Sequence, residues 1–246
     1  MNYFDHYHPG LSVDCVIFGF HENELKVLLL KMKNSKKWAV PGGFVRKNEN
    51  VDDAAKRELK SRTSIEDIYL KQFHLFGDAY RSSDQYVDTL VKDQVIQSDM
   101  DSWFRQRFIT LGYYALLEFS KVIPSPGKNA ELCDWVPLNE IPDLILDHAT
   151  IIDKALLTLR NQLRFEPIGK NLLPIEFTMN ELRILYETIL GEELDRRNFQ
   201  RKMLSFSILD KLDHVRKGGA HKAPFLYTFN EEKYNQSLKK GFNTVW

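Results

Sequence analysis

The sequence predicts an α/β domain followed by a smaller α+β domain. Strand-like segments in the first two thirds enclose a glycine turn and a helix. In the last third, two helical segments precede two short strand-like segments. Between these regions, Pro167, Gly169 and Pro174 interrupt a helical pattern, as expected for a linker. We therefore expect residues 1–165 to form the first domain and residues 166–246 the second.

Composition indicates a soluble globular protein without a membrane partner. The 246 residues are 43% hydrophobic and 28% charged, and the formal net charge is zero. No apolar run approaches the roughly 20 residues that span a bilayer, and the first residues lack a signal-peptide pattern. The two cysteines, Cys15 and Cys133, lie in apolar segments, so we expect buried thiols in a cytoplasmic protein.

Alternating apolar residues, rich in β-branched and aromatic types, predict the strands of the first domain. Apolar residues at helical spacing then predict a helix within Ile141–Leu163. A mixed sheet with a helix on each side fits this order. The expected strands are Leu11–Phe20, Leu25–Lys31, Trp38–Val40, Ile68–Phe76, Phe108–Phe119 and Asp134–Pro137.

The segment Gly42–Ile65 reads as a glycine turn, a loop and a helix. Glycines suit backbone that approaches another group closely. Asp52 and Asp53 are placed to cap the helix and to interact favourably with its N-terminus.

The spacing in this segment resembles the Nudix box, G-x5-E-x7-R-E-U-x-E-E-x-G-U, where U is aliphatic. The first half matches in full, whereas Ser61 and Arg62 replace the acidic pair and Ser64 replaces the late glycine. Nudix hydrolases hold Mg²⁺ or Mn²⁺ with that pair, and hard cations require oxygen ligands. The resemblance thus implies the Nudix α/β/α sandwich without its metal or its reaction. Matching positions are Gly43, Glu49, Arg57, Glu58, Leu59 and Ile65.

The polar stretch Tyr80–Gln106 is long for a loop within a compact domain, so it is either functional or a variable surface insertion. A short helix or a lid is possible at Val91–Ile96 and at Trp103-Phe104.

The second domain has the element order of a winged helix-turn-helix. Thr178 and Glu181 form a capping box at the start of a helix that Gly191 ends. Asp195 caps a second helix, Arg196 to about Phe206. Two strands, Ile208–Val215 and Pro224–Phe229, then enclose a basic glycine-containing loop.

Residues 196–222 hold eight Lys/Arg and two Asp, a local charge of +6. Basic side chains meet DNA phosphates, whereas Arg, Asn and Gln can read base edges. We expect the second helix to enter the major groove and the loop to touch the backbone or the minor groove. The predicted DNA contacts are Arg196, Arg197, Asn198, Gln200, Arg201, Lys202, Lys217, His221 and Lys222.

A degenerate Nudix box followed by a winged helix resembles the Nudix-related transcriptional regulators, the NrtR family. Further points of resemblance are Asp147-His148, PIGKNLLP, FTMNELRILYETILGE and DRRNFQRKM. The last two resemble the Bacteroidetes branch that controls sugar use, including an arabinose-responsive regulator, whereas other branches respond to ADP-ribose. The resemblance implies a homodimer on palindromic operator DNA that an effector releases.

The effector, a pentose such as L-arabinose or else ADP-ribose, is expected between the box helix, the first strand and the Phe108–Phe119 strand. Glu49 and Arg57 are expected to pair with each other, and His148 is expected to cap a helix or to bind effector. No cofactor is expected. The candidate effector-binding residues are Asp14, Lys31, Trp38, Glu58, Tyr113 and His148.

Two alternatives stay open. The first is an active Nudix pyrophosphohydrolase for ADP-ribose-like nucleotides, with Glu49 and Glu58 joined by Glu66 or Asp67 as metal ligands. The second is a protein-binding module whose basic helix meets an acidic partner.

Overall fold

The computed structural model describes residues 3–66, 69–81, 84–93, 96, 100–128, 130–215 and 223–240. The chain forms two compact units, residues 1–19 with 26–156 and residues 20–25 with 157–246. The division falls within a helix, so the boundary at residue 165 stays a prediction. No helix in the described ranges is both long and apolar enough to cross a bilayer.

The first unit is built on a seven-stranded sheet. Its central order is β3-β2-β1-β6-β5, while β4 pairs with β1 and β7 pairs with β2. All the predicted strands are present. The elements are η1 Tyr3–His6, β1 Tyr7–His21, β2 Glu24–Met32, β3 Trp38–Ala39, β4 Gly42–Arg46, α1 Val51–Thr63, β5 Tyr69–Phe76, α2 Asp84–Lys92, α3 Asp101–Phe104, β6 Ile109–Glu118, η3 Phe119–Lys121, β7 Ala130–Pro137, η4 Leu138–Glu140 and α4 His148–Leu163.

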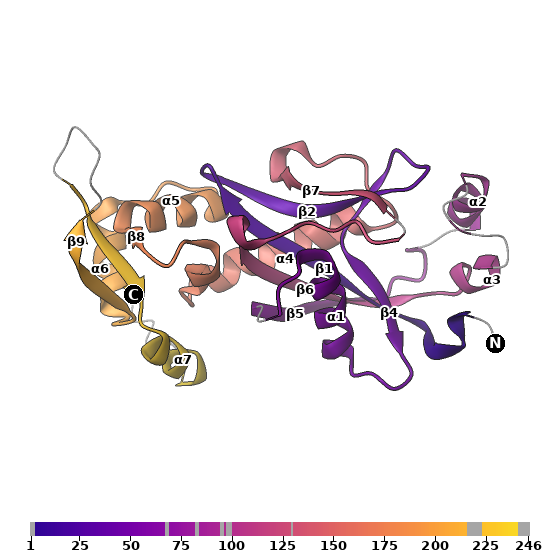
Figure 1. Ribbon diagram of the computed structural model, residues 1–246, viewed down its shortest axis with the longest axis horizontal. Helices are drawn as coiled ribbons and strands as arrows, with labels where there is room; N and C mark the ends of the chain where they lie inside the picture. Colours follow the sequence, from indigo (N-terminus) through magenta and orange to yellow (C-terminus); the bar gives the residue numbers. More distant parts are fainter. Residues whose placement is uncertain are drawn as a thin grey trace. The chain divides into compact units, whose positions relative to one another are not determined.

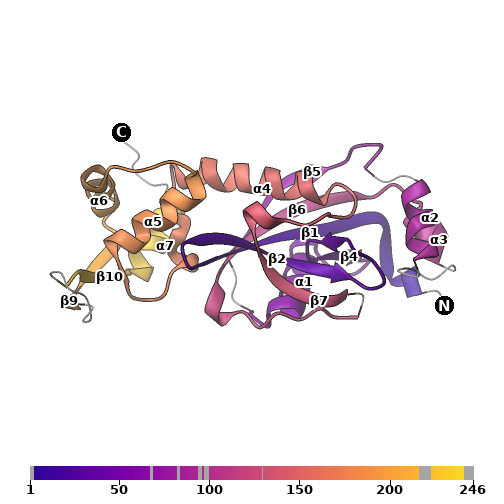
Figure 2. The same ribbon diagram turned by 90° about the horizontal axis from the view of Figure 1, so that it is seen from above.

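The sheet lies between helices, with α1 on one face and the first part of α4 on the other (Figure 2). Alternate residues of β1, such as Cys15 and Ile17, pack with Leu59 of α1 in one apolar cluster. Because successive strand residues point to opposite faces, Asp14 lies on the α4 side. The predicted α/β/α sandwich with a mixed sheet is thus confirmed. Cys15 and Cys133 are buried free thiols, as expected.

Helix α1 differs from the prediction at its start. Asn50 occupies the N-cap, without a side-chain capping bond, and its Nδ2 donates to Asp53 Oδ2 at 2.9 Å. Asp52 and Asp53 lie within the first turn, where they act on the helix dipole and do not cap it. Helix α1 ends at Thr63, and the C-cap residue Ser64 has a left-handed φ of 61°. A Nudix box has glycine there, which adopts this conformation without strain.

The insertion is partly helical and is anchored to β4. Helix α2 begins earlier than the segment Val91–Ile96 suggested, whereas Trp103 and Phe104 lie in α3 as expected. The Trp103 ring is 5.5 Å from that of Phe44 and 5.9 Å from that of Phe108, and Trp103 is only 8% exposed. The α3 segment is therefore packed into the first unit.

The second unit contains the predicted winged-helix elements (Figure 1). The Thr178–Glu181 capping box, the left-handed Gly191 and the Asp195 cap are all confirmed. Residues 216–222, which include the basic loop, lie outside the described residues. Helix α7 was not predicted. The unit contains η5 Ile168–Leu172, β8 Phe177–Thr178, α5 Met179–Leu190, α6 Arg196–Ser205, β9 Leu209–Val215, β10 Phe225–Phe229 and α7 Glu231–Lys240, with sheet order β8-β10-β9.

Candidate functional site

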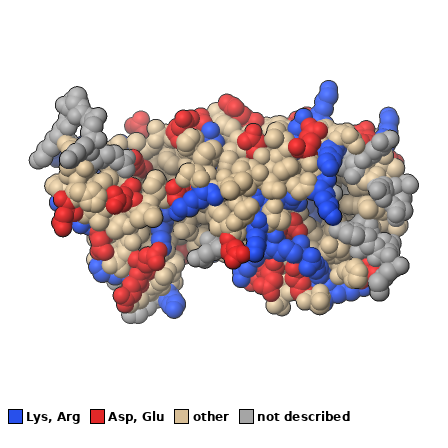
Figure 3. All heavy atoms as spheres, viewed as in Figure 1, with Lys and Arg blue, Asp and Glu red and all other residues tan. Residues whose placement is uncertain are grey.

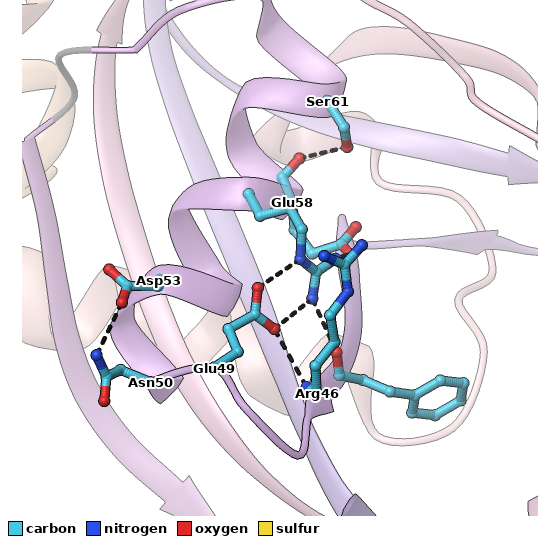
Figure 4. Close-up of polar contacts among 8 residues, drawn as sticks. Arg46, Glu49, Asn50, Asp53, Glu58 and Ser61 are labelled. Atoms are coloured by element: carbon cyan, nitrogen blue, oxygen red, sulfur yellow. Dashed lines mark hydrogen bonds and ion pairs between the residues drawn. The ribbon is translucent and has the colours of Figure 1, made fainter. Parts of the chain in front are cut away.

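The box region is organised around the Arg57 guanidinium. Its Nε donates to Glu49 Oε1 at 2.7 Å, and its Nη2 donates to Glu49 Oε2 and to the Phe44 carbonyl, both at 2.9 Å. The Arg46 N–H also donates to Glu49 Oε2, at 3.1 Å (Figure 4). The expected Glu49–Arg57 pair is present, and its hydrogen bonds lower the pKa of Glu49. These contacts join α1 to the β4 strand and the following loop.

The Glu58 carboxylate is held between two arginines. Arg57 bonds it directly, and Arg62 Nη2 lies 3.9 Å from Glu58 Oε2. Burial raises the pKa of Glu58, and the two arginines partly offset that rise. Arg62 Nη1 also donates to the Pro126 carbonyl at 2.8 Å. Arg62 therefore places a cation beside Glu58 at one of the two positions that are acidic in a Nudix box.

Ser61 is likewise engaged, because its hydroxyl donates to the Glu58 carbonyl at 2.7 Å (Figure 4). Of the proposed substitute metal ligands, Glu49 and Glu58 both contact Arg57. Glu66 is exposed and pairs with Lys60, and Asp67 lies outside the described residues. Within the described ranges, no three His, Cys, Asp or Glu side chains gather as a metal site. The described residues of the box therefore do not fit the Mg²⁺ that the Nudix fold implies.

The two glycines of the turn let the β4 backbone pass between two carboxylates. A Cβ on Gly42 would overlap Asp14 Oδ1, and a Cβ on Gly43 would overlap Glu58 Oε1. Neighbouring strand residues face opposite sides of the sheet, so Asp14 and Glu58 occupy different faces. The structure therefore separates these two predicted effector residues.

Asp14 lies instead in a second polar cluster, which includes an arginine that the sequence did not single out. Arg81 Nε and Nη2 donate to the two oxygens of Asp147, each at 2.8 Å. Arg81 Nη2 is 3.7 Å from Asp14 Oδ2, and His148 Nε2 is 3.9 Å from Asp14 Oδ1. Asp14 and His148 are thus brought together, and Arg81 links them to the start of the insertion.

The His148 ring accepts a hydrogen bond from the backbone of the loop before β4. The Val40 N–H donates to His148 Nδ1 at 3.1 Å, so a neutral ring carries its proton on Nε2. Burial lowers the pKa of His148, which favours this neutral form at pH 7. Although His148 is the first residue of α4, its ring bonds the loop before β4, so the described contact is not a helix cap.

Tyr113 and Lys31, two further predicted effector residues, have partners outside this cluster. Tyr113 Oη donates to Asp52 Oδ1 at 2.5 Å, on the α1 face. Lys31 Nζ pairs with Glu131 at 2.5 Å. Trp38 is half-buried, and its backbone bonds the segment before α4. Their assignment to effector binding stays a prediction.

Helix α6 presents an exposed polar face in the second unit. Phe199 and Met203 are buried, which leaves Arg197, Asn198 and Arg201 exposed on the opposite side. Arg196 is also exposed and Gln200 is half-buried. On the molecular face in Figure 3, basic and acidic side chains are interspersed over the described surface.

The predicted DNA contact Lys202 is less exposed than Arg197 and Arg201 on the same helix. Lys202 is half-buried, and its Nζ donates to the Arg164 carbonyl at 3.3 Å, which gives it an intramolecular partner. The loop residues Lys217, His221 and Lys222 lie outside the described residues. All of these contacts with DNA stay predictions.

Known proteins and families match both units. Residues 169–229 match the NrtR DNA-binding winged helix domain, and residues 8–157 match the NUDIX domain. A repressor of Acinetobacter baylyi, named "ADPR responsive transcriptional repressor NtrR", is 30% identical over 238 residues, covering 94% of this chain and 86% of that protein. The chain belongs to the NrtR family. It therefore has an N-terminal Nudix domain followed in the sequence by a DNA-binding winged-helix domain.

Other relatives agree with this assignment of fold. The crystal structure of Shewanella oneidensis NrtR matches with a TM-score of 0.73 and 24% identity, over 92% of this chain and 96% of that one. The same NrtR complexed with a 27mer DNA gives the same TM-score and identity, over 92% and 95%. An ADP-ribose pyrophosphatase of Methanocaldococcus jannaschii is 29% identical over 148 residues, covering 59% of this chain and 72% of the enzyme.

Proposed function

We propose that this NrtR-family protein is a sequence-specific transcriptional repressor whose operator binding is controlled by a small effector in the Nudix domain. The observation that carries the proposal is a basic α6 face together with a Nudix box in which Ser61 and Arg62 replace the two acidic residues. Such a box can hold a ligand without cleaving it. Ligand binding would then change the affinity of the winged helix for operator DNA.

We propose ADP-ribose as the effector. The Acinetobacter relative is named as a repressor responsive to this nucleotide, and it matches nearly the whole chain. L-arabinose is the second candidate, because DRRNFQRKM and the α5 sequence resemble the sugar-responsive branch. We also propose that the protein acts as a cytoplasmic homodimer on a two-fold operator, since protein symmetry matches half-site symmetry in such complexes.

The test is a fluorescence-anisotropy titration against DNA from upstream of the protein's own gene neighbourhood. Half-maximal binding is expected at nanomolar protein and is expected to weaken steeply as salt rises. ADP-ribose or L-arabinose, added separately, should release the DNA. Binding that ignores DNA sequence and salt would instead favour the protein-binding alternative.

The absence of hydrolysis is part of the proposal and has its own experiment. Relative to the acidic pair, Ser61 and Arg62 change the local charge by +3, which removes the attraction for Mg²⁺. Purified protein with Mg²⁺ and ADP-ribose should release no AMP. The variant carrying Ser61→Glu and Arg62→Glu should bind Mn²⁺ where the unaltered protein does not. AMP release by the unaltered protein would support the hydrolase alternative.

A further inference from the structure

We propose that the Arg62 guanidinium takes the place of the metal ion of a Nudix box. It supplies positive charge beside Glu58 and ties residues 123–126 to α1, so that the Nudix domain needs no divalent cation for its stability. This inference goes beyond the proposed function, and because its test uses neither effector nor DNA, the two can fail separately.

The first argument is the charge balance of the box. Glu58 is 8% exposed, and a carboxylate buried to this degree requires positive charge nearby. Burial raises the pKa of Glu58, whereas Arg57 and Arg62 both act to lower it. Together with Glu49, which bonds Arg57, the box holds two carboxylates and two guanidiniums, and their formal charges cancel. With acidic residues at positions 61 and 62, the box would hold four carboxylates against one guanidinium, a balance that attracts a divalent cation.

The second argument is the fixed position of the arginine. Only 14% of the Arg62 side chain is exposed. Its Nη1 donates to the Pro126 carbonyl at 2.8 Å, and its Nη2 lies 3.9 Å from Glu58 Oε2. Carbonyl and carboxylate oxygens are the protein ligands that hard cations also take. Arg62 therefore interacts with the kinds of oxygen that would otherwise hold a metal ion.

The third argument is the backbone of the segment that Arg62 contacts. The Ser125 N–H donates to the Arg62 carbonyl at 3.0 Å. The Ile123 N–H donates to the Thr63 carbonyl at 3.4 Å. These bonds satisfy two carbonyls at the C-terminal end of α1, which lack partners within the helix. Gly127 has a left-handed φ of 67°, and a Cβ there would overlap Arg62 Nη1, so the segment is shaped to receive this side chain.

Thermal unfolding of the full chain in EDTA, Mg²⁺ or Mn²⁺ tests this inference. The melting temperature of the unaltered protein should be the same in all three conditions. Arg62→Ala should lower the melting temperature by about 5 °C, because a buried carboxylate loses a cation and a carbonyl loses its donor. Arg62→Lys keeps the positive charge without the planar fork, so it should recover part of that loss.

Charge reversal separates the role of the charge from general damage to the fold. Arg62→Glu adds a third carboxylate beside Glu49 and Glu58, so in EDTA it should be less stable than Arg62→Ala. Mn²⁺ should then raise the melting temperature of Arg62→Glu by several degrees. The matched control is Lys60→Glu, because Lys60 lies on the same helix and forms an exposed ion pair with Glu66. The melting temperature of Lys60→Glu should fall by less than about 2 °C and should not respond to Mn²⁺.

Hydrogen–deuterium exchange gives a local measurement that does not depend on the folding of Arg62→Glu. In Arg62→Ala, the amides of Ile123 and Ser125 should exchange about tenfold faster, whereas the amides of β1 should change less. The inference is wrong if EDTA lowers the melting temperature of the unaltered protein, if Arg62→Ala is as stable as that protein, or if Arg62→Lys is no more stable than Arg62→Ala. Mn²⁺ that stabilised Lys60→Glu as much as Arg62→Glu would also contradict it.

Discussion

Replacing Arg201 with alanine tests the α6 face as a DNA-binding surface. Arg201 is exposed, and Nη2 donates to Asn198 Oδ1 at 3.0 Å, one turn earlier on the same helix. An exposed pair of this kind contributes little to folding, so the free energy of unfolding should change by less than about 0.5 kcal/mol. The effect on DNA binding should be much larger.

The magnitude depends on what Arg201 contacts. A phosphate contact contributes about 0.9 to the slope of log K against log salt, so its loss should flatten that slope by roughly one. A base contact should cost about 1–3 kcal/mol, or roughly 5- to 150-fold in operator affinity, and should relax sequence preference. Arg197→Ala is expected to behave in the same way, because it lies on the same exposed face.

The assay is anisotropy against operator and scrambled DNA at four salt concentrations. Lys239→Ala, which removes an exposed cation from α7, controls for the loss of one positive charge. Effector binding, followed by calorimetry, should be unchanged in every variant. If Arg197→Ala and Arg201→Ala both kept the affinity and salt slope of the unaltered protein, α6 would not be the recognition helix.

Three further predictions concern the box. Gly43→Ala should lower the free energy of unfolding by about 1–3 kcal/mol, measured in urea, because its Cβ would overlap the Glu58 carboxylate. Ser64→Gly should raise the free energy of unfolding by about 0.5–1 kcal/mol, because glycine tolerates the φ of 61°. Glu49→Gln should flatten the pH dependence of the melting temperature. Hydrogen bonding to Arg57 lowers the pKa of Glu49 in the folded protein below its pKa in the unfolded chain. The ionised Glu49 therefore stabilises the folded protein at pH values above the unfolded-state pKa, and this stabilisation is lost as pH falls through the folded-state pKa. A Glu49→Gln variant that kept the full acid dependence would contradict this explanation.

Local signals predicted the second unit well. The Thr178–Glu181 capping box, Gly191 and Asp195 each act within a few residues, so the sequence alone marks the ends of α5 and α6. Helix α7 had a similar signal, since Asn230 Oδ1 accepts from the Lys233 N–H at the helix start. Asn230 before two glutamates is thus a local signal for the start of α7.

The polar clusters could not be predicted to the same depth. The Glu49–Arg57 pair spans eight residues and belongs to a known motif, so spacing revealed it. Arg81, by contrast, bonds Asp147, which is 66 residues away. Nothing near Arg81 in the sequence indicates that contact, because it depends on how the insertion and the start of α4 meet in space. Sequence also placed Asp14 and Glu58 in one pocket, whereas the pleat of the sheet separates them.

The central claim is that effector and operator bind to the same protein with opposing effects. Coupling between two sites is reciprocal, so each ligand must weaken the other by the same factor. We would measure operator affinity with and without saturating ADP-ribose or L-arabinose, and the affinity of that effector with and without operator. Equal factors of about 5- to 150-fold are expected for one of these effectors. Operator affinity that stays constant while a bound effector saturates the protein would contradict it.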